Sequence, residues 1–131
     1  QQAVPSAACH QAIDPGIAET TAYAMNLNVT QGVAKMAQLA NHRKTFAKTG
    51  TNEQLSIASG GFIPQVAAFV ITGNAERPTS LAGMTINGRS KATWYGADLA
   101  MPTWVQFMNQ YCDQAKIPQD NNYGTPDAKY M

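Results

Sequence analysis

A lysine, two threonines and a glycine follow one another at Lys48, Thr49, Gly50 and Thr51, just after a short apolar run. A lysine ammonium supplies a fixed positive charge, and threonine hydroxyls can hold a carboxylate. Gly50 has no Cβ, so a substrate can approach the backbone closely there. The N–H group after the glycine can point at a developing oxyanion. These four residues, the KTGT segment, are common enough to recur by chance, so their context decides their meaning.

The overall composition predicts a globular chain of one domain or part of one. The 131 residues are 44 % hydrophobic and 13 % charged, which argues against global disorder. Nine basic and eight acidic residues give a net charge of +1, and no basic cluster is large enough to predict a nucleic-acid partner. No apolar run reaches membrane-spanning length. Residues 1–5 do not form a signal peptide as they stand, which is compatible with an excised piece of a larger exported protein.

The cysteines and histidines give no metal-binding pattern. Cys9 and Cys112 lie far apart and no CxxC occurs, which argues against a zinc ribbon. Two free or buried thiols are the simpler interpretation, and a single disulfide is the alternative in an oxidising compartment. His10 and His42 lack a matching ligand pair, so we expect surface or loop histidines, and neither a metal nor a cofactor.

A helix is predicted over residues 14–29. Asp14 offers an N-cap oxygen, and the proline that follows it has a backbone angle already suited to a first helical residue. Apolar residues then recur at helical spacing. The next stretch, residues 33–40, is expected to be a helical turn or a loop pinned by Met36 and Leu39.

Three antiparallel strands are predicted to follow, over residues 44–48, 55–62 and 66–72. Lys48 then falls at the end of the first strand. The second strand contains a glycine pair, Gly60-Gly61, which predicts a bulge or a close backbone approach. The third strand is nearly all apolar, as for a central strand covered on both faces. Residues 73–93 are predicted to be a loop or insertion.

A second helix is predicted over residues 99–111, with Pro102 in its first turn. Helical spacing or ordinary burial of aromatic residues predicts core positions for several large side chains: Trp94, Tyr95, Trp104, Phe107, Met108 and Tyr111. For Trp94 and Tyr95, which precede the helix, lining of the groove rim is the alternative. The polar end of the chain from Pro118 is expected to be mobile. The order helix, three strands, helix predicts an α+β fold, with a core over about 12–112 and a tail over 113–131.

Several spaced motifs resemble the C-terminal part of penicillin-binding-protein transpeptidase domains. The KTGT segment is followed by Gly61-Phe62-Ile63-Pro64, which matches a Gly-aromatic-x-Pro turn. Ala100-Met101-Pro102-Thr103-Trp104 then matches an Ala-x-Pro-x-Trp/Phe helix start. Upstream, Ile13-Asp14-Pro15 resembles the start of a helix of this family. The resemblance covers about residues 12–111, and the bifunctional class, which joins a glycosyltransferase to the transpeptidase, is the most similar.

The resemblance implies a role for each residue of the KTGT segment. Lys48 would set a positive potential around the catalytic serine, and Thr49, Gly50 and Thr51 would form the substrate-binding wall. The Thr51 N–H would be half of the oxyanion hole. The family reaction is attack on a D-Ala-D-Ala bond of a peptidoglycan stem peptide, loss of D-Ala and acyl transfer to an amine. The expected partners are therefore stem peptides and β-lactams.

The catalytic nucleophile that the resemblance implies is missing from this chain. None of its serines is followed by lysine three residues later or by asparagine two residues later: Ser6, Ser56, Ser59, Ser80 and Ser90. Acyl transfer requires a nucleophile with an adjacent base. We therefore expect this chain to be inactive alone and to pair with the upstream half of the same domain. The location implied is the bacterial envelope, outside the cytoplasm, with membrane attachment only through an N-terminal anchor absent from this sequence.

Two departures from the family pattern lie beside the expected site. Ala47 stands where a glycine usually precedes the lysine, and Ser56-Ile57-Ala58 replaces the usual Asp-Ala-Trp. A fragment of a serine β-lactamase or DD-carboxypeptidase, which shares the lysine-threonine-glycine wall, is therefore an alternative. A non-catalytic envelope domain that binds peptides is another. The Ala-x-Pro-x-Trp helix start favours the transpeptidase.

Overall fold

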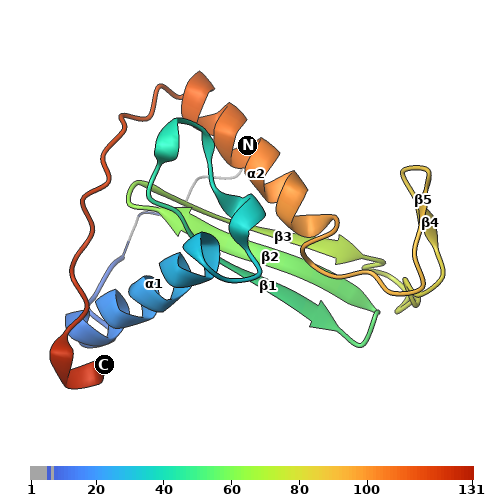
Figure 1. The fold of residues 1–131 in the computed structure, drawn as a ribbon, viewed down its shortest axis with the longest axis horizontal. Coiled ribbons are helices and arrows are strands. Elements are labelled where there is room, and N and C mark those ends of the chain that lie inside the picture. Colours follow the sequence, from blue (N-terminus) through green and yellow to red (C-terminus); the bar gives the residue numbers. More distant parts are fainter. Residues whose placement is uncertain (1–5, 7) are drawn as a thin grey trace.

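The computed structural model describes residue 6 and residues 8–131, which form an α+β fold. Two α-helices lie against a three-stranded antiparallel sheet with the strand order β1-β2-β3 (Figure 1). The elements are α1 (Pro15–Thr30), β1 (Phe46–Asn52), β2 (Ser56–Ile63), β3 (Val66–Gly73) and α2 (Ala100–Gln114). The predicted fold class and the order of its elements are confirmed. No helix in the described part of the chain is long and apolar enough to cross a membrane.

Helix α1 begins at the predicted cap. The Asp14 Oδ1 atom accepts a hydrogen bond from the Gly16 N–H at 2.8 Å, and Pro15 is the first helical residue. After the helix, two short 3₁₀ turns, η1 (Lys35–Ala37) and η2 (Ala40–His42), lead to the sheet.

The prediction for the loop between the first helix and the sheet is half right. Leu39 is buried as expected, whereas Met36 is about half exposed. Pinning by Met36 is therefore wrong, because the 3₁₀ turn η1 buries Ala37 in place of the methionine.

Strand β1 is longer at its C-terminal end than the sequence predicted. Its pairing with β2 continues to Asn52, opposite Ser56, and the turn begins only there, where the Leu55 N–H donates to the Asn52 carbonyl. The prediction that Lys48 ends the strand is therefore wrong. The whole KTGT segment lies inside β1, and Lys48 faces Gly60 across the ladder.

Strand β3 is an edge strand, which corrects the prediction of a central strand covered on both faces. Its exposure alternates along the strand. Phe69 and Ile71 are about two-thirds exposed, while Val66, Ala68 and Val70 pack toward the core on the other face. A continuous apolar run predicts burial. On this face, however, the Tyr123 ring packs on Phe46 and Phe62 of β1 and β2, whereas Phe69 and Ile71 of β3 stay exposed within the described residues.

Helix α2 supplies large core side chains on the covered face of the sheet. Met101, Trp104 and Met108 are fully buried there, in a cluster with Ala47 and Ile63 of the sheet. The Trp104 indole N–H donates to the Ala68 carbonyl at 3.0 Å, which fixes the helix across the strands.

Core positions are confirmed for only some of the predicted large side chains. Trp94 is buried as predicted, but Tyr95 is exposed. The prediction that Phe107 and Tyr111 lie in the core is also wrong. Their rings stack on each other on the exposed flank of α2, with centroids 5.9 Å apart. Helical spacing identified the helix but not how wide its buried face is.

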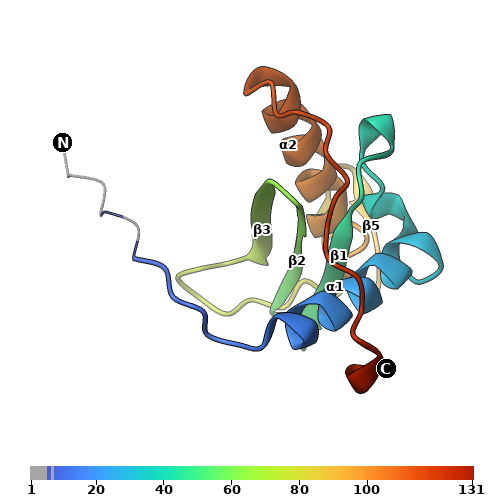
Figure 2. The same ribbon diagram turned by 90° about the vertical axis from the view of Figure 1, so that its left-hand side faces the viewer.

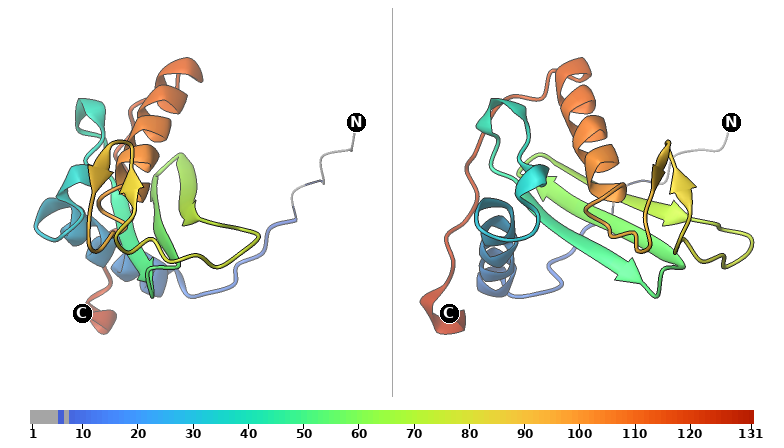
Figure 3. Two further views of the ribbon diagram at one scale, coloured as in Figure 1. Left: turned by 90° about the vertical axis from the view of Figure 1, so that its right-hand side faces the viewer. Right: turned by 45° about the vertical axis from the view of Figure 1, so that its right-hand side comes forward.

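The predicted loop over residues 73–93 contains a small second sheet. Strands β4 (Thr85–Ile86) and β5 (Arg89–Ser90) form a hairpin. It stands apart from the main sheet near the N-terminal end of α2 (Figure 3). Trp94 anchors the hairpin, because its indole N–H donates to the Met84 carbonyl at 3.1 Å.

The C-terminal tail is ordered against the rest of the chain, so the prediction of a mobile tail is wrong. It runs from the end of α2 past α1 (Figure 2) and ends in the 3₁₀ turn η3 (Ala128–Tyr130). The Arg43 guanidinium donates to the carbonyls of Ile117 and Pro118 at 2.7 and 3.0 Å. The Tyr123 ring packs against that of Phe46, 4.8 Å away. Polar residues hold the tail through backbone groups, which composition alone does not reveal.

Candidate functional site

The KTGT segment lies on the outer edge of the sheet, because β1 pairs with β2 on one side only. Helix α1 covers the first half of this edge with two side-chain amides. The Asn26 Nδ2 atom donates to the Thr45 carbonyl, and the Asn28 Nδ2 atom donates to the Ala47 carbonyl, both at 2.9 Å. Beyond Ala47 this cover by α1 ends, in the part of the chain that the structure describes.

The backbone groups of Thr49 and Thr51 point to this open part of the edge. In an antiparallel strand, the N–H and C=O groups of alternate residues point to the same side. The Ala47 carbonyl points away from β2, toward Asn28. The backbone groups two and four residues further along the strand therefore point outward as well. The Thr51 N–H therefore points away from β2, toward the open side of the strand.

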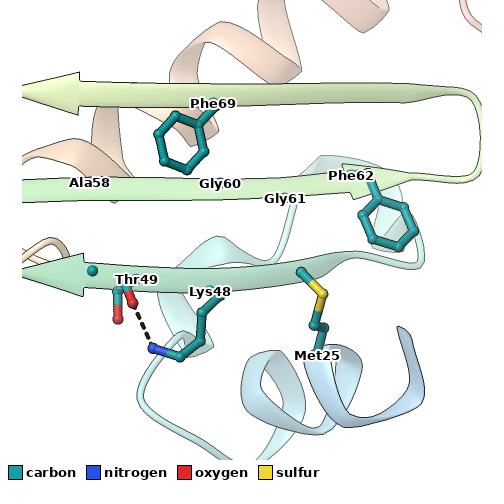
Figure 4. Close-up of a pocket in the computed structure, with 9 residues that line it drawn as sticks. Met25, Lys48, Thr49, Ala58, Gly60, Gly61, Phe62 and Phe69 are labelled. Atoms are coloured by element: carbon teal, nitrogen blue, oxygen red, sulfur yellow. Dashed lines mark hydrogen bonds between the residues drawn. The ribbon is translucent and has the colours of Figure 1, made fainter. Parts of the chain in front are cut away.

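Lys48 brings a positive charge to the same stretch. Its Nζ atom donates to the Thr49 carbonyl at 2.6 Å, and its side chain is exposed (Figure 4). The ammonium group therefore lies where the open edge begins, beside the backbone donors that an anionic ligand would use. This arrangement places a fixed cation next to two outward backbone positions.

Gly50 leaves the strand open to an approaching molecule. A Cβ atom built at this position would have the Ala58 Cβ as its nearest neighbour, at 3.8 Å. The chain itself therefore has room for a side chain at Gly50, and the glycine keeps that room free. This geometry fits a backbone that a ligand approaches closely.

Gly96 packs against the strand on its other face. A Cβ atom there would lie 2.4 Å from the Ala58 carbonyl oxygen and 2.7 Å from that of Gly50, so only a glycine fits. The Gly96 N–H donates to the Thr51 Oγ1 atom at 3.4 Å. Because the Thr51 hydroxyl oxygen accepts this bond, its proton stays available for a ligand.

A pocket of about 330 Å³ opens on the face of the sheet that α2 leaves uncovered (Figure 4). It is lined by Met25, Lys48, Thr49, Gly50, Ala58, Gly60, Gly61, Phe62 and Phe69. The glycine pair forms its floor, and the Phe69 ring lies so close that a Cβ at Gly60 would be 2.3 Å from it. The pairing of β1 with β2 continues without interruption through both glycines. The prediction of a close approach to the backbone at Gly60-Gly61 is therefore confirmed, and the alternative of a bulge is wrong.

An ion pair fixes the segment that carries Gly96. The Asp98 carboxylate accepts hydrogen bonds from the Lys91 ammonium and, at 2.9 Å, from the Tyr95 N–H. Burial by itself raises the pKa of Asp98. The bonds from Lys91 and from the Tyr95 N–H, together with the charges of Lys91 and Arg89, outweigh it and hold that pKa below its ordinary value. Asp98 is therefore an ionised anchor at neutral pH.

The cysteines and histidines lie outside this site. Cys9 is exposed and Cys112 is buried in the α2 core, and both are free thiols, so the alternative of a disulfide is not formed. Among the described residues, no group of three His, Cys, Asp or Glu side chains could hold a metal ion. His42 lies in the 3₁₀ turn η2.

Three residues that shape the site were missed by the sequence analysis: Asn26, Asn28 and Gln54. Asparagine is a poor residue for the interior of a helix. Two of them near the end of α1 were therefore a usable signal for tertiary hydrogen bonds. Gln54, which lies in the turn after β1, gave no signal of its own.

Comparison of the chain with protein-family models, with curated proteins and with solved structures found no match in any of the three.

Proposed function

We propose that this chain is part of a peptidoglycan DD-transpeptidase of the bacterial envelope, and that it supplies the KTGT wall but not the nucleophile. One observation carries the proposal. The KTGT segment forms an open sheet edge at which the Lys48 cation, the bare backbone at Gly50 and the outward N–H of Thr51 meet. The order of the flanking motifs supports the same assignment.

The open edge suits an extended peptide. Such a peptide can bind to β1 as an additional strand, with backbone hydrogen bonds to the outward groups of Thr49 and Thr51. The Thr51 N–H would then donate to the oxygen of the carbonyl under attack, where negative charge develops. The Lys48 charge and the threonine hydroxyls would hold the terminal carboxylate of a D-Ala-D-Ala stem peptide, or of a β-lactam.

A serine from another segment completes the reaction. Its hydroxyl oxygen attacks the carbonyl carbon between the two D-alanines, its proton goes to a neighbouring base, and the terminal D-Ala leaves with a proton on its amine. An amine of a second stem peptide then attacks the acyl-serine ester, forms the cross-link and releases the serine. Ser59, the one serine buried in the sheet, donates to the carbonyls of Ala58 and Gly96, which gives it no base.

The uncovered face of the sheet is where we place the upstream half of the domain. Phe69 and Ile71 are exposed there beside the pocket, and no strand among the described residues pairs with the outer edge of β3. Burying two such side chains contributes roughly 1.5–3 kcal/mol each, which favours association with a covering segment. A serine carried by that segment would approach β1 from the pocket side.

The test is the rate at which penicillin acylates the full-length protein. Lys48→Ala should reduce this rate by on the order of a hundredfold or more, as for loss of an oxyanion-hole donor. Lys44→Ala is the matched control: Lys44 precedes the same strand, and its ammonium lies over the Phe46 ring, 5.8 Å from the centroid. We expect the control to react like the unmodified protein.

Equal rates for the two lysine variants would contradict the role given to Lys48. The lifetime of the adduct separates the transpeptidase from its closest alternative. A transpeptidase should keep its penicilloyl group for a long time, whereas fast hydrolysis would indicate a serine β-lactamase.

A further inference from the structure

Gln54 lies in the turn between β1 and β2 in a conformation that its own chemistry disfavours. Its φ angle is +60°, and that of Glu53 is +45°. A turn with two consecutive left-handed residues usually contains asparagine or glycine. A strained backbone of this kind persists only where its surroundings hold it. The surroundings of Gln54 therefore indicate what the turn is for.

The Gln54 side chain pairs with the backbone of Trp94 through two hydrogen bonds. Its Nε2 atom donates to the Trp94 carbonyl at 2.9 Å, and its Oε1 atom accepts from the Trp94 N–H at 2.8 Å. The Gln54 carbonyl also accepts from the Leu81 N–H at 2.7 Å. One residue thus links the end of the KTGT strand to two distant positions of the chain.

Trp94 is a rigid partner for this link. Its side chain is 1 % exposed and lies in a second core cluster with Ile57, Leu81 and Ala100. A shift of Gln54 would therefore move the turn or the backbone that follows Trp94, rather than be absorbed by the tryptophan itself.

The backbone after Trp94 reaches the candidate site within two residues. Gly96 lies against Gly50, and its N–H donates to the Thr51 hydroxyl oxygen at 3.4 Å. The Ser59 hydroxyl donates to the Gly96 carbonyl at 3.3 Å, which holds the other side of the same residue. Gly96 therefore occupies an acceptor position of the Thr51 hydroxyl oxygen and leaves the hydroxyl proton for another partner.

We propose that Gln54 is a positioning residue that, through Trp94 and Gly96, directs the Thr51 hydroxyl proton toward the carboxylate of a ligand bound along β1. The inference rests on the proposed function, because it assigns the carboxylate selectivity of that same site. It predicts that Gln54 affects carboxylate-bearing ligands and leaves esters of the same ligands nearly unaffected.

The test compares acylation of the full-length protein by a penicillin with acylation by its methyl ester. Gln54→Glu keeps the length of the side chain and the oxygen that accepts from the Trp94 N–H. It replaces the Nε2 donor with a second oxygen, which cannot donate to the Trp94 carbonyl. We expect the rate with the free acid to fall about tenfold, as for loss of a hydrogen bond to a charged group, and the ester rate to change less than about twofold. Thr51→Val should give the same pattern.

The double variant Gln54→Glu/Thr51→Val should lose no more acid selectivity than Thr51→Val alone, because both changes act on one hydroxyl. Gln65→Glu is the matched control. Its amide also donates to a backbone carbonyl, that of Asp120 at 2.8 Å, but in the turn at the other end of the sheet. The control should keep the acid-to-ester ratio of the unmodified protein.

Two results would overturn the inference: equal losses with acid and ester, which indicate a purely structural role, or no change in either rate. If Gln54→Glu does not fold, Gln54→Met, which removes both hydrogen bonds without adding a charge, gives the same comparison. Failure of the proposed function gives a different result from failure of this inference, because in that case neither the penicillin nor its methyl ester acylates the unmodified protein.

Discussion

Two glycines of the sheet differ in what their missing side chains make possible. A Cβ at Gly61 would lie 2.3 Å from the Phe46 carbonyl oxygen and 3.0 Å from the Trp104 ring, so the packing of the chain itself requires this glycine. At Gly50 the nearest atom would be 3.8 Å away, and the space opens toward the pocket. Packing of the chain therefore requires a glycine at position 61 but not at position 50, where the free space fits the ligand approach proposed above.

This difference predicts opposite results for two alanine substitutions in the full-length protein. Gly61→Ala should lower the free energy of unfolding by about 1–3 kcal/mol, the usual cost of overpacking. Gly50→Ala should change it by less than about 0.5 kcal/mol, as for a site without a clash, yet should slow acylation by penicillin. Urea unfolding and penicillin labelling measure the two effects, and a large loss of stability in Gly50→Ala would contradict this assignment.

The segment from Trp94 to Asp98 is the element that connects the second core cluster to the KTGT strand. Its shape depends on Asp98, which binds the Tyr95 N–H and the Lys91 ammonium, while Lys91 also lies over the Trp94 ring, 5.7 Å from its centroid. These contacts place Gly96 against Gly50. The order of this segment therefore depends on one ionised carboxylate.

The lowered pKa of Asp98 sets the pH range of this stabilisation. A carboxyl group with a lower pKa in the folded state stabilises the fold fully above its ordinary pKa of about 3.9, and the effect is lost as the pH falls through the lowered value. Asp98→Asn should therefore lower the melting temperature at pH 7, and the gap to the unmodified protein should close in acid. Thermal unfolding between pH 2.5 and 7 measures this. A gap that stays constant down to the lowest pH would contradict it.

Element boundaries that depend on neighbouring residues could be predicted from the sequence, whereas a boundary that depends on contacts between distant residues could not. The cap at Asp14 and the two-residue turn after Ile63 are local, and both element boundaries were predicted closely. The end of β1 was missed, because Glu53 and Gln54 form their turn without a glycine, and hydrogen bonds to the distant Trp94 and Leu81 help to hold it there.

The candidate site was predictable in its residues but not in its geometry. The sequence identified the KTGT segment and the outward Thr51 N–H. Two asparagines inside α1 signalled tertiary hydrogen bonds, but the sequence did not show that Asn26 and Asn28 cover the first half of the same edge, or that Gly96 lies behind Gly50. These contacts join residues tens of positions apart in the chain, which spacing along one strand or helix does not encode.

At the scale of the whole molecule, the sheet is covered unevenly. Helix α2 packs on one face, α1 covers part of the β1 edge, and the opposite face with Phe69 and Ile71 stays exposed (Figures 1 and 3). An exposed apolar face next to a free strand edge is a liability for a chain on its own. We therefore expect a second segment of the same domain to cover this face and to bring the serine.

The most direct test is to locate the penicillin adduct on the full-length protein by digestion and peptide mass mapping. We predict one labelled serine, outside residues 1–131 and followed by lysine three residues later, in a polypeptide that also yields peptides of this chain. A full-length protein that stays unlabelled, or a label on one of the serines of this chain, would contradict the proposed function.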